Sequence, residues 1–430
     1  MEQDLWLTPS ERLKVIGALT RFGLIKWSND RNLPLKSGGF TDIYVNLRDM
    51  RSVPEATAYL ADLYGPTLLR LGVRRFVEVP ESVSGLAGAI SARFGIPYIT
   101  IRAEAKDGRV SSAKVIGQCL PNELVSTLDD VITDGGSKVG PLQECQKLGL
   151  RQGPMVVLVD RQQGWKENFE RLGIRTPVWA GMTLHDIRAF LIRNNLMERC
   201  DPTAEAKNPL IVAYDGKTWE KILPFLDLLR RTGCIIKVND LLFDEGIGNL
   251  IPELSVYGRV MADLKSHDIP NTIANIMKHC RNCPPWAVTV HASGGGEMIK
   301  AAKQILARTG TLVLAVTVLT SLKDEHCKDI FRRDSVSQVK KSAKIAKEAG
   351  ADGVVCSPRE TTTVLSVFPE AIVVNPGVRS AGADTHDQAR VDTPENAIQA
   401  GAKYVVMGRE IMNADDPVAK VKEINERLAV

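Results

Sequence analysis

The chain has 430 residues, more than one typical domain holds, so we expect two domains that each bury a core of their own. Its formal net charge of +4 is small for this length, which argues against a dedicated nucleic-acid-binding protein but suits an anionic small-molecule substrate. The amino-terminal residues lack the apolar core of a signal peptide, and no apolar run is long enough to span a bilayer. We therefore expect a cytoplasmic protein without a membrane partner.

The first part of the chain has the alternation of an α/β domain. Four short apolar runs, separated by helix-compatible segments such as residues 54–72, carry the residue types that strands favour. The predicted strands are 76–80, 97–101, 123–132 and 154–160. We predict a smaller parallel-sheet domain over residues 1–199. The polar residues 200–209, which include two prolines, are predicted to form a linker.

Residues 210–430 are more regular. Eight short apolar runs alternate with helix-compatible segments over about 220 residues, near the size of one (β/α)8 TIM barrel. The predicted strands are 210–214, 233–238, 258–263, 287–291, 311–318, 353–357, 371–375 and 403–408. A doubly wound sheet is the alternative, but the eight regular repeats and the residues at the strand ends favour the barrel.

Polar and charged residues cluster at the predicted carboxyl ends of these strands, where barrel chemistry takes place. In chain order they are Asp215, Lys237, Asp263, Lys265, His291, Ser293, Thr320, Ser357, Arg379 and, directly after Gly408, Arg409. Any one of them alone is more often a surface or capping residue, so their joint placement is what indicates a site.

Asp263 and Lys265 are two residues apart, so in a regular strand both side chains face the barrel mouth. Lys237, one strand earlier, is expected beside them, which gives an alternating array of cation, carboxylate and cation. Each ammonium favours the ionised carboxylate. Such an array would repel a substrate carboxylate and hold Lys265 as the proton donor to the carbon that the carboxylate leaves. A structural ion network is the alternative.

A second cluster follows the last two predicted strands. The loop from Arg379 to Gln388 and the pair Gly408-Arg409 fall near the usual phosphate site of a barrel. Arginine offers a planar fork that matches phosphate, and glycine lets backbone N–H groups approach it. The sequence therefore indicates a phosphorylated small-molecule substrate.

Motifs along residues 209–430 resemble, in order, the orotidine 5′-phosphate decarboxylases of the bacterial type. They are DLKSHDIPNT, VTVHASGG, AVTVLTSL, GVVCS, NPGVR with ADTHDQAR, and YVVMGR. The resemblance implies a cofactor-free barrel homodimer that converts orotidine monophosphate to uridine monophosphate. The alternative is a sugar-phosphate decarboxylase with a related Asp-x-Lys-x-x-Asp core and a metal. The IPNT continuation and the DQ pair argue against this alternative.

The resemblance also implies a role for each matched residue. Lys265 would protonate C6 as carbon dioxide departs, in a catalytic set completed by Lys237, Asp263 and Asp268. Asp268 would reach into the site of the partner subunit. The implied substrate contacts are Asp215 and Lys237 on the ribose, Thr320 on the pyrimidine, Arg379, Gln388, Gly408 and Arg409 on the phosphate, and Ile269 and Thr272 across the dimer.

In the first domain, LVSTLDDVITDGGSK (124–138) ends an apolar run with an acidic pair and a glycine-rich turn. Alone it could be an ordinary strand-to-helix turn. Together with LKSGGFTDIYVNLR (35–48) and VLVDRQQGWKENFERLGI (157–174), it resembles the orotate phosphoribosyltransferases, in which the acids bind ribose hydroxyls and backbone N–H groups bind the 5′-phosphate. The implied site residues are Lys36, Arg102, Lys106, Asp129, Asp130, Thr133, Gly135, Ser137 and Arg161, with Mg²⁺ as cofactor if the domain is active.

Three departures from that family bear on whether the site works. Ala103 and Ser84 stand where the family has lysines, and Asp134 stands at a small position of the phosphate loop. Lysines and Mg²⁺ stabilise the departing pyrophosphate, so two lost cations and one gained anion weaken that stabilisation. We expect the transferase activity to be absent or strongly reduced. The alternative is a fully bifunctional enzyme that uses other cations, such as Arg102, Lys106, Arg109 or Lys138.

The eight cysteines are scattered, as in proteins of a reducing cytosol. Cys280 and Cys283 have the spacing of half a zinc site, but no second pair matches them, so we expect free thiols and no metal. Because transferases of this kind commonly dimerise as well, the resemblances imply a homodimer through the barrel and allow a higher oligomer through the first domain.

Overall fold

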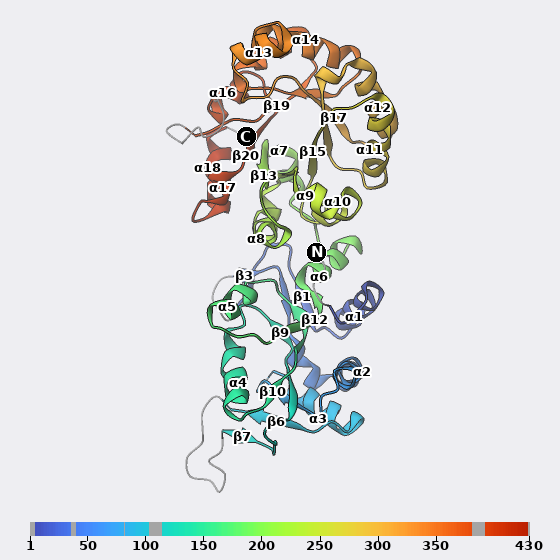
Figure 1. Ribbon diagram of the computed structural model, residues 1–430, viewed down its shortest axis with the longest axis vertical. Helices are drawn as coiled ribbons and strands as arrows, with labels where there is room; N and C mark the ends of the chain where they lie inside the picture. The colour runs from blue at the N-terminus through green and yellow to red at the C-terminus, as the bar shows by residue number, and fades with distance from the viewer. Residues whose placement is uncertain (1–4, 36–39, 81, 103–113, 381–391, 429–430) are drawn as a thin grey trace. The chain divides into compact units, whose positions relative to one another are not determined.

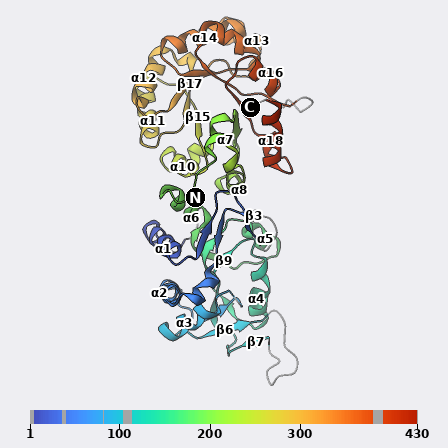
Figure 2. The ribbon, with the colours of Figure 1, turned by 180° about the vertical axis from the view of Figure 1, so that it is seen from behind.

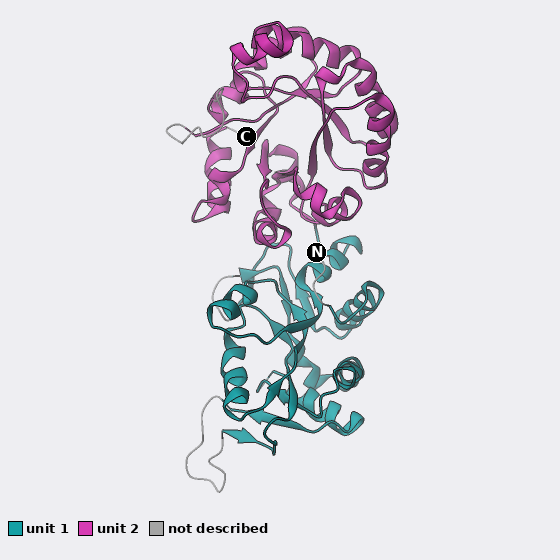
Figure 3. Ribbon diagram, in the orientation of Figure 1, with its two compact units in different colours: residues 1–198 teal, residues 199–430 magenta. Residues whose placement is uncertain are grey.

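The computed structural model of the chain describes residues 5–35, 40–80, 82–102, 114–380 and 392–428. It divides into two compact units, residues 1–198 and 199–430, which Figure 3 shows in different colours. Each unit has its own α/β fold and is described by itself below.

A central sheet organises the first unit. Its strands lie in the order β12-β11-β8-β5-β6-β7, with β10 beside β8 and β9 beside β11. Neighbouring described strands run parallel, except that β7 is antiparallel to β6. The bounds are β5 (Arg75–Glu78), β6 (Tyr98–Ile101), β7 (Val115–Ile116), β8 (Leu124–Leu128), β9 (Val131–Ile132), β10 (Arg151–Gln152), β11 (Met155–Asp160) and β12 (Val178–Thr183).

Helices cover both faces of this sheet, with α1 to α3 on one side and α4 and α5 on the other (Figures 1 and 2). One apolar cluster lies beneath α1, α2, α3 and α6, and two smaller ones lie beneath α4 and α5. The helices are α1 (Pro9–Arg21), α2 (Pro54–Arg70), α3 (Ser84–Phe94), α4 (Gly136–Lys147), α5 (Trp165–Arg171) and α6 (Leu184–Arg193). The short pairs β1 (Ile25–Trp27) with β4 (Ile43–Val45) and β2 (Leu33–Pro34) with β3 (Phe40–Thr41), and η1 (Leu47–Ser52), complete the unit.

In the second unit, eight parallel strands close into a barrel, which confirms the predicted fold class. Their bounds are β13 (Leu210–Ala213), β14 (Ile235–Val238), β15 (Val260–Ser266), β16 (Ala287–His291), β17 (Leu312–Val316), β18 (Gly353–Val355), β19 (Ile372–Asn375) and β20 (Tyr404–Met407). Alternate residues of all eight strands, among them Ile235, Met261 and Ala287, form one apolar cluster. Since side chains alternate along a strand, the residues two positions further on face the same interior, at the carboxyl end.

Helices surround the barrel strands (Figure 1). They are α8 (Trp219–Leu229), α9 (Leu241–Glu245), α10 (Ile247–Leu254), α11 (Pro270–Asn282), α12 (Gly296–Leu306), α13 (Asp324–Phe331), α14 (Ser335–Glu348), α15 (Thr361–Val367), α16 (Pro394–Gln399), α17 (Arg409–Met412) and α18 (Pro417–Arg427). Short 3-10 turns are η2 (Arg230–Thr232), η3 (Ala292–Gly294) and η4 (Pro358–Glu360). Among the described residues, no helix combines the length and apolar character needed to cross a membrane.

The segment 200–209, predicted to be a linker, is instead largely helical and belongs to the second unit. Asp201 accepts the N–H groups of Thr203 and Ala204, and a proline stands at the first position of α7 (Pro202–Lys207), so capping starts a helix that the polar composition concealed. The helix packs against the barrel, because a Cβ at Gly233 would lie 2.4 Å from the carbonyl carbon of Ala204.

We therefore expect Gly233→Ala to destabilise the barrel more than Gly350→Ala does. Both glycines have φ +77°, so both variants bear the strain of a left-handed alanine, about 1 kcal/mol. A Cβ at Gly350 meets nothing within 4 Å, whereas one at Gly233 displaces α7. The excess should be about 1 kcal/mol or more, measured from hydrogen exchange of the barrel strands at increasing urea. Equal losses would contradict the packing of α7.

Candidate active site

The carboxyl ends of β13, β14 and β15 bring four of the predicted charged residues into contact. The Nζ of Lys237 lies 2.6 Å from Oδ2 of Asp215 and 3.0 Å from Oδ2 of Asp263. The Nζ of Lys265 lies 2.5 Å from the same Oδ2 of Asp263. The side chains of Lys237 and Asp263 are buried, whereas those of Asp215 and Lys265 are partly exposed. Cation, carboxylate and cation thus alternate at the end of the barrel interior.

The backbone at Lys265 departs from regular strand geometry. Four steps along β15, from Ala262 to Ser266, match only two along β16, so the strand bulges here. Lys265 has φ +46°, a left-handed conformation that costs a non-glycine residue free energy. Its backbone N–H donates to Thr289 Oγ1 at 2.8 Å, which holds the bulge against β16. The simple two-residue alternation used in the sequence analysis therefore does not describe this end of the strand.

Two further residues support the array, and the sequence analysis singled out neither. Thr289 donates to Oδ1 of Asp263 at 2.9 Å, so both oxygens of the buried carboxylate are paired. Asn239 donates from Nδ2 to the backbone carbonyl of Asp263 at 2.5 Å. A hydroxyl in the apolar run AVTVH, two residues beyond the interior Ala287, was an available signal for Thr289. The local sequence around Asn239 holds no comparable signal.

Mutual pairing keeps the array charged. Burial alone would raise the pKa of Asp263, but Lys237 and Lys265 outweigh burial and lower that pKa to about 2. Burial likewise disfavours the protonated form of Lys237, but Asp263 and Asp215 outweigh it and raise the pKa of this lysine above its usual value. At neutral pH the barrel mouth therefore holds a buried, ionised carboxylate beside an accessible ammonium.

Asp268, Ile269 and Thr272 do not join this array within one chain. Asp268 is exposed, and its Oδ1 accepts the N–H of Ile269 at 2.7 Å. The apolar side chain of Ile269 is 65% exposed, and Thr272 lies in the first turn of α11. Both Asp268 and Ile269 are therefore exposed to solvent in the single chain.

The predicted phosphate and base contacts lie at other strand ends. Arg379 follows β19, and burial together with the nearby Arg409 lowers its pKa. At Gly408, after β20, a Cβ would lie 3.0 Å from the carbonyl oxygen of Ala213, so the close approach of β13 leaves no room for a side chain. Thr320 lies in the loop after β17. Gln388 lies outside the described residues.

The acidic pair of the first unit follows β8. Asp129 is fully buried and forms an ion pair with Lys138 of α4, whose side chain is also buried. Burial raises the pKa of Asp129 to about 7, and Lys138 opposes that rise. Asp130 is partly exposed and accepts the N–H of Val131 at 2.7 Å. One of the two predicted ribose-binding carboxylates is therefore already paired inside the protein.

Asp134 lies in the turn before α4, where the phosphate loop is predicted. Its Oδ1 accepts the N–H of Gly136 at 3.0 Å and the hydroxyl of Thr133 at 3.3 Å. At Gly135, with φ +75°, a Cβ would fall 2.5 Å from the ring of Phe169. Ser137 is exposed in the first turn of α4. A carboxylate thus takes an N–H group that such a loop would offer to a bound anion.

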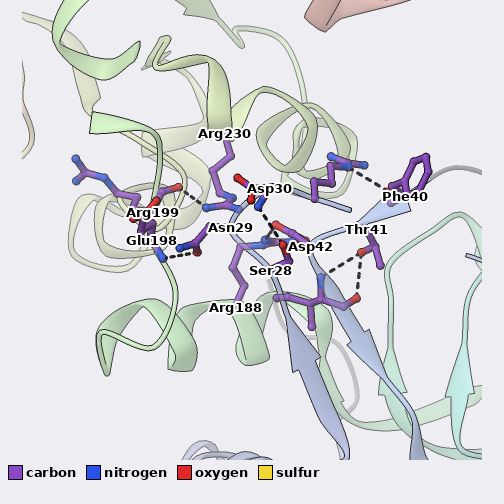
Figure 4. A network of polar contacts seen from close by, with 12 residues as sticks. Ser28, Asn29, Asp30, Phe40, Thr41, Asp42, Arg188, Glu198, Arg199 and Arg230 are labelled. Atoms are coloured by element: carbon purple, nitrogen blue, oxygen red, sulfur yellow. Dashed lines mark hydrogen bonds and ion pairs between the residues drawn. The ribbon is translucent and has the colours of Figure 1, made fainter. Parts of the chain in front are cut away.

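Arg161, the predicted orotate contact, is buried and donates to the hydroxyl of Thr41 at 3.2 Å. Figure 4 shows Thr41 with its neighbour Asp42, which is paired with the buried Arg188. Arg102 follows β6, and its backbone N–H donates to the carbonyl of Lys114 at 2.9 Å. Lys36 and Lys106 lie outside the described residues.

In the ranges that the structure describes, no group of three or more His, Cys, Asp or Glu side chains is placed to hold a metal ion. Cys280 is buried in α11, and the thiol of Cys283 donates to the carbonyl oxygen of His279 at 3.2 Å. Burial raises the pKa of both thiols. Both cysteines are therefore uncharged free thiols at neutral pH.

A closed parallel barrel with a buried lysine–carboxylate–lysine array at its carboxyl end, and arginines at neighbouring strand ends, defines a TIM-barrel enzyme with a site suited to an anionic substrate. Residues 208–424, about half of the chain, match the family model described as orotidine 5′-phosphate decarboxylase / HUMPS family. The chain belongs to this family.

Individual relatives match about half of the chain. An orotidine 5′-phosphate decarboxylase of Saccharophagus degradans is 39% identical over 225 residues, which is 51% of this chain and 94% of the relative. One of Pseudoalteromonas translucida is 40% identical over 230 residues, 52% of this chain and 98% of the relative. A solved orotidine 5′-phosphate decarboxylase from Lactobacillus acidophilus is 34% identical, with a TM-score of 0.46, and the match covers 52% of this chain and all of that one.

We expect Thr289→Val to destabilise the barrel, while Thr289→Ser stays near the wild type. Valine leaves Oδ1 of the buried Asp263 and the N–H of Lys265 without the hydroxyl that now pairs both, at a cost of about 1–3 kcal/mol. Serine keeps the hydroxyl. Urea unfolding of the two variants, read through hydrogen exchange of β15, measures the difference; equal stabilities would contradict the assigned role of Thr289.

Proposed function

We propose that the barrel decarboxylates orotidine 5′-monophosphate to uridine 5′-monophosphate without a cofactor, a step of pyrimidine biosynthesis. The observation that carries this proposal is the placement of two ammonium groups on one oxygen of the buried Asp263. The family match and the relatives named orotidine 5′-phosphate decarboxylase support it.

In the proposed reaction, the ionised Asp263 repels the substrate carboxylate. This repulsion is relieved as the bond from C6 to the carboxyl carbon breaks. The electron pair stays on C6, carbon dioxide leaves, and the Nζ of Lys265 supplies the proton that completes uridine monophosphate. Lys265 then regains a proton from solvent. Lys237 keeps Asp263 ionised and, with Asp215, contacts the ribose.

The phosphate group binds away from the reacting carbon, to Arg379, Gln388, Gly408 and Arg409. Binding free energy gained there stabilises the transition state at C6. Thr320 faces the pyrimidine. Asp268, Ile269 and Thr272 complete the site of the other subunit in a homodimer, which agrees with the exposure of Asp268 and Ile269 in one chain.

A metal-dependent sugar-phosphate decarboxylase is the other activity that a related Asp-x-Lys-x-x-Asp core would allow. In that chemistry carboxylates at the barrel mouth ligate a cation. Here the ammonium of Lys237 already bridges Asp215 and Asp263. This pairing favours the cofactor-free reaction.

For residues 1–199 we propose an orotate phosphoribosyltransferase-like domain with absent or strongly reduced activity. Asp129 is paired with Lys138, Asp134 accepts an N–H of the loop that would bind phosphate, and Ser84, at the start of α3, replaces a lysine. The competing proposal, a fully bifunctional enzyme with Mg²⁺, counted Lys138 among its replacement cations. Because Lys138 is buried against Asp129, it is committed to that carboxylate.

Lys265→Ala should lower kcat for orotidine monophosphate decarboxylation by at least about 100-fold, since it removes the proton donor. Lys278→Ala is the matched control, because Lys278 is an exposed lysine on α11 whose Nζ donates to the nearby Asn275. Spectrophotometric conversion to uridine monophosphate measures both variants. Near-normal turnover of Lys265→Ala with an intact fold would refute the role of Lys265.

With orotate, phosphoribosyl pyrophosphate and Mg²⁺, the full-length protein should consume orotate no faster than a protein-free control. Robust consumption would contradict the impaired domain and establish the bifunctional alternative. If the wild type consumes no orotate, the triple variant Ala103→Lys, Ser84→Lys and Asp134→Ser should consume it faster, because these changes restore two cations and remove one anion. Ala103 itself lies outside the described residues.

A further inference from the structure

His267, in the middle of DLKSHDIPNT, packs against the end of β16 and the turn that follows it. Its Nε2 lies 3.4 Å from Ser293 Oγ, and its ring meets that of His291 edge to face, with centroids 5.7 Å apart. A Cβ at Gly294 would overlap the side chain of Met298 and lie 3.0 Å from Cδ2 of His267, so the glycine leaves room for both side chains. The last residue of β16 and two residues of the following turn therefore contact this exposed imidazole, and we call these three residues its seat.

The contacts of His267 lie between the active-site residue Lys265 and the exposed residues Asp268 and Ile269. On one side, the N–H of Lys265 is held by Thr289 of β16. On the other side come Asp268 and Ile269, both exposed, before α11 begins at Pro270. Asp268 accepts a hydrogen bond from the N–H of the next residue, a local contact that does not tie the segment to the barrel. The contacts of His267 do tie it, to the end of the neighbouring strand and the turn that follows it.

We propose that His267 is a positioning residue: its ring, seated by His291, Ser293 and Gly294, fixes the direction in which Asp268 and Ile269 leave the barrel and so completes the active site of a second copy of this chain. The inference rests on the proposed function. A carboxylate supplied by another subunit must be held to a fraction of an ångström, because a misplacement of about 1 Å can cost 100-fold in rate. An exposed segment without a tether would not meet that demand.

The first experiment compares His267→Ala with His267→Phe and a control, His279→Ala. His279 is an exposed histidine on α11 outside the site. We expect His267→Ala to lower kcat by about 10- to 100-fold with little change in KM, since the phosphate contacts lie elsewhere. His267→Phe, which keeps a ring in the seat, should recover most of that loss. Wild-type kcat in His267→Ala, or equal losses in the alanine and phenylalanine variants, would overturn the proposal.

The second experiment tells which site His267 serves. In a dimer of one Lys265→Ala subunit and one His267→Ala subunit, one site has an intact Lys265 and receives an intact segment from its partner. Random mixing should therefore restore about a quarter of the wild-type activity, since half of the dimers are mixed and each holds one complete site. A mixture of Lys265→Ala with Asp268→Ala should behave alike.

Rescue by Asp268→Ala without rescue by His267→Ala would place His267 in its own subunit's site and overturn the proposal, while leaving the proposed function intact. Rescue by neither would show that the segment does not act across subunits, which also overturns it. An inactive wild-type protein would instead refute the proposed function itself.

Discussion

The geometry of the candidate active site depends on one carboxylate oxygen that lies between two ammonium groups. Oδ2 of the buried Asp263 contacts Nζ of Lys237 and Nζ of Lys265, and Thr289 pairs the other oxygen. Removing one partner of a buried ion pair costs several kcal/mol, so the ends of β14, β15 and β16 must keep their relative positions. The bulge at Lys265 and the contact of Asn239 with the backbone of Asp263 are local means to that end.

The first unit also holds a buried carboxylate paired with a lysine, but there the ammonium is not accessible to a ligand. Around Asp263 one ammonium remains reachable, because the side chain of Lys265 is 37% exposed. In the pair of Asp129 and Lys138 the side chains are 0% and 7% exposed, so neither charge is offered to a ligand. Both sets of charges are balanced, since Lys237 also pairs with Asp215, but only the barrel leaves a paired ammonium, that of Lys265, within reach of a ligand.

The barrel and its charged mouth could be predicted from the sequence because both follow from local patterns. Apolar runs of strand length and a polar residue at each end suffice to place Lys237 and Asp263 at one mouth. The bulge could not be predicted, since it depends on the register between β15 and β16. Neither could the contact of Asn239, which is set by the distance between neighbouring strand ends. Polar composition suggested a linker at 200–209, whereas the capping of α7 by Asp201 and its packing against Gly233 are tertiary facts.

The ionisation of Asp263 is the central claim, and its titration tests it most directly. A depressed folded-state pKa stabilises the protein above the ordinary value of about 4 and loses that stabilisation as pH falls toward 2. The carboxyl ¹³C resonance of Asp263, assigned by comparison with Asp263→Asn, should show no titration between pH 8 and pH 4. Its midpoint should lie near 2, and it should rise when Lys237 is replaced by alanine. A midpoint at or above 4 in the wild type would contradict the account.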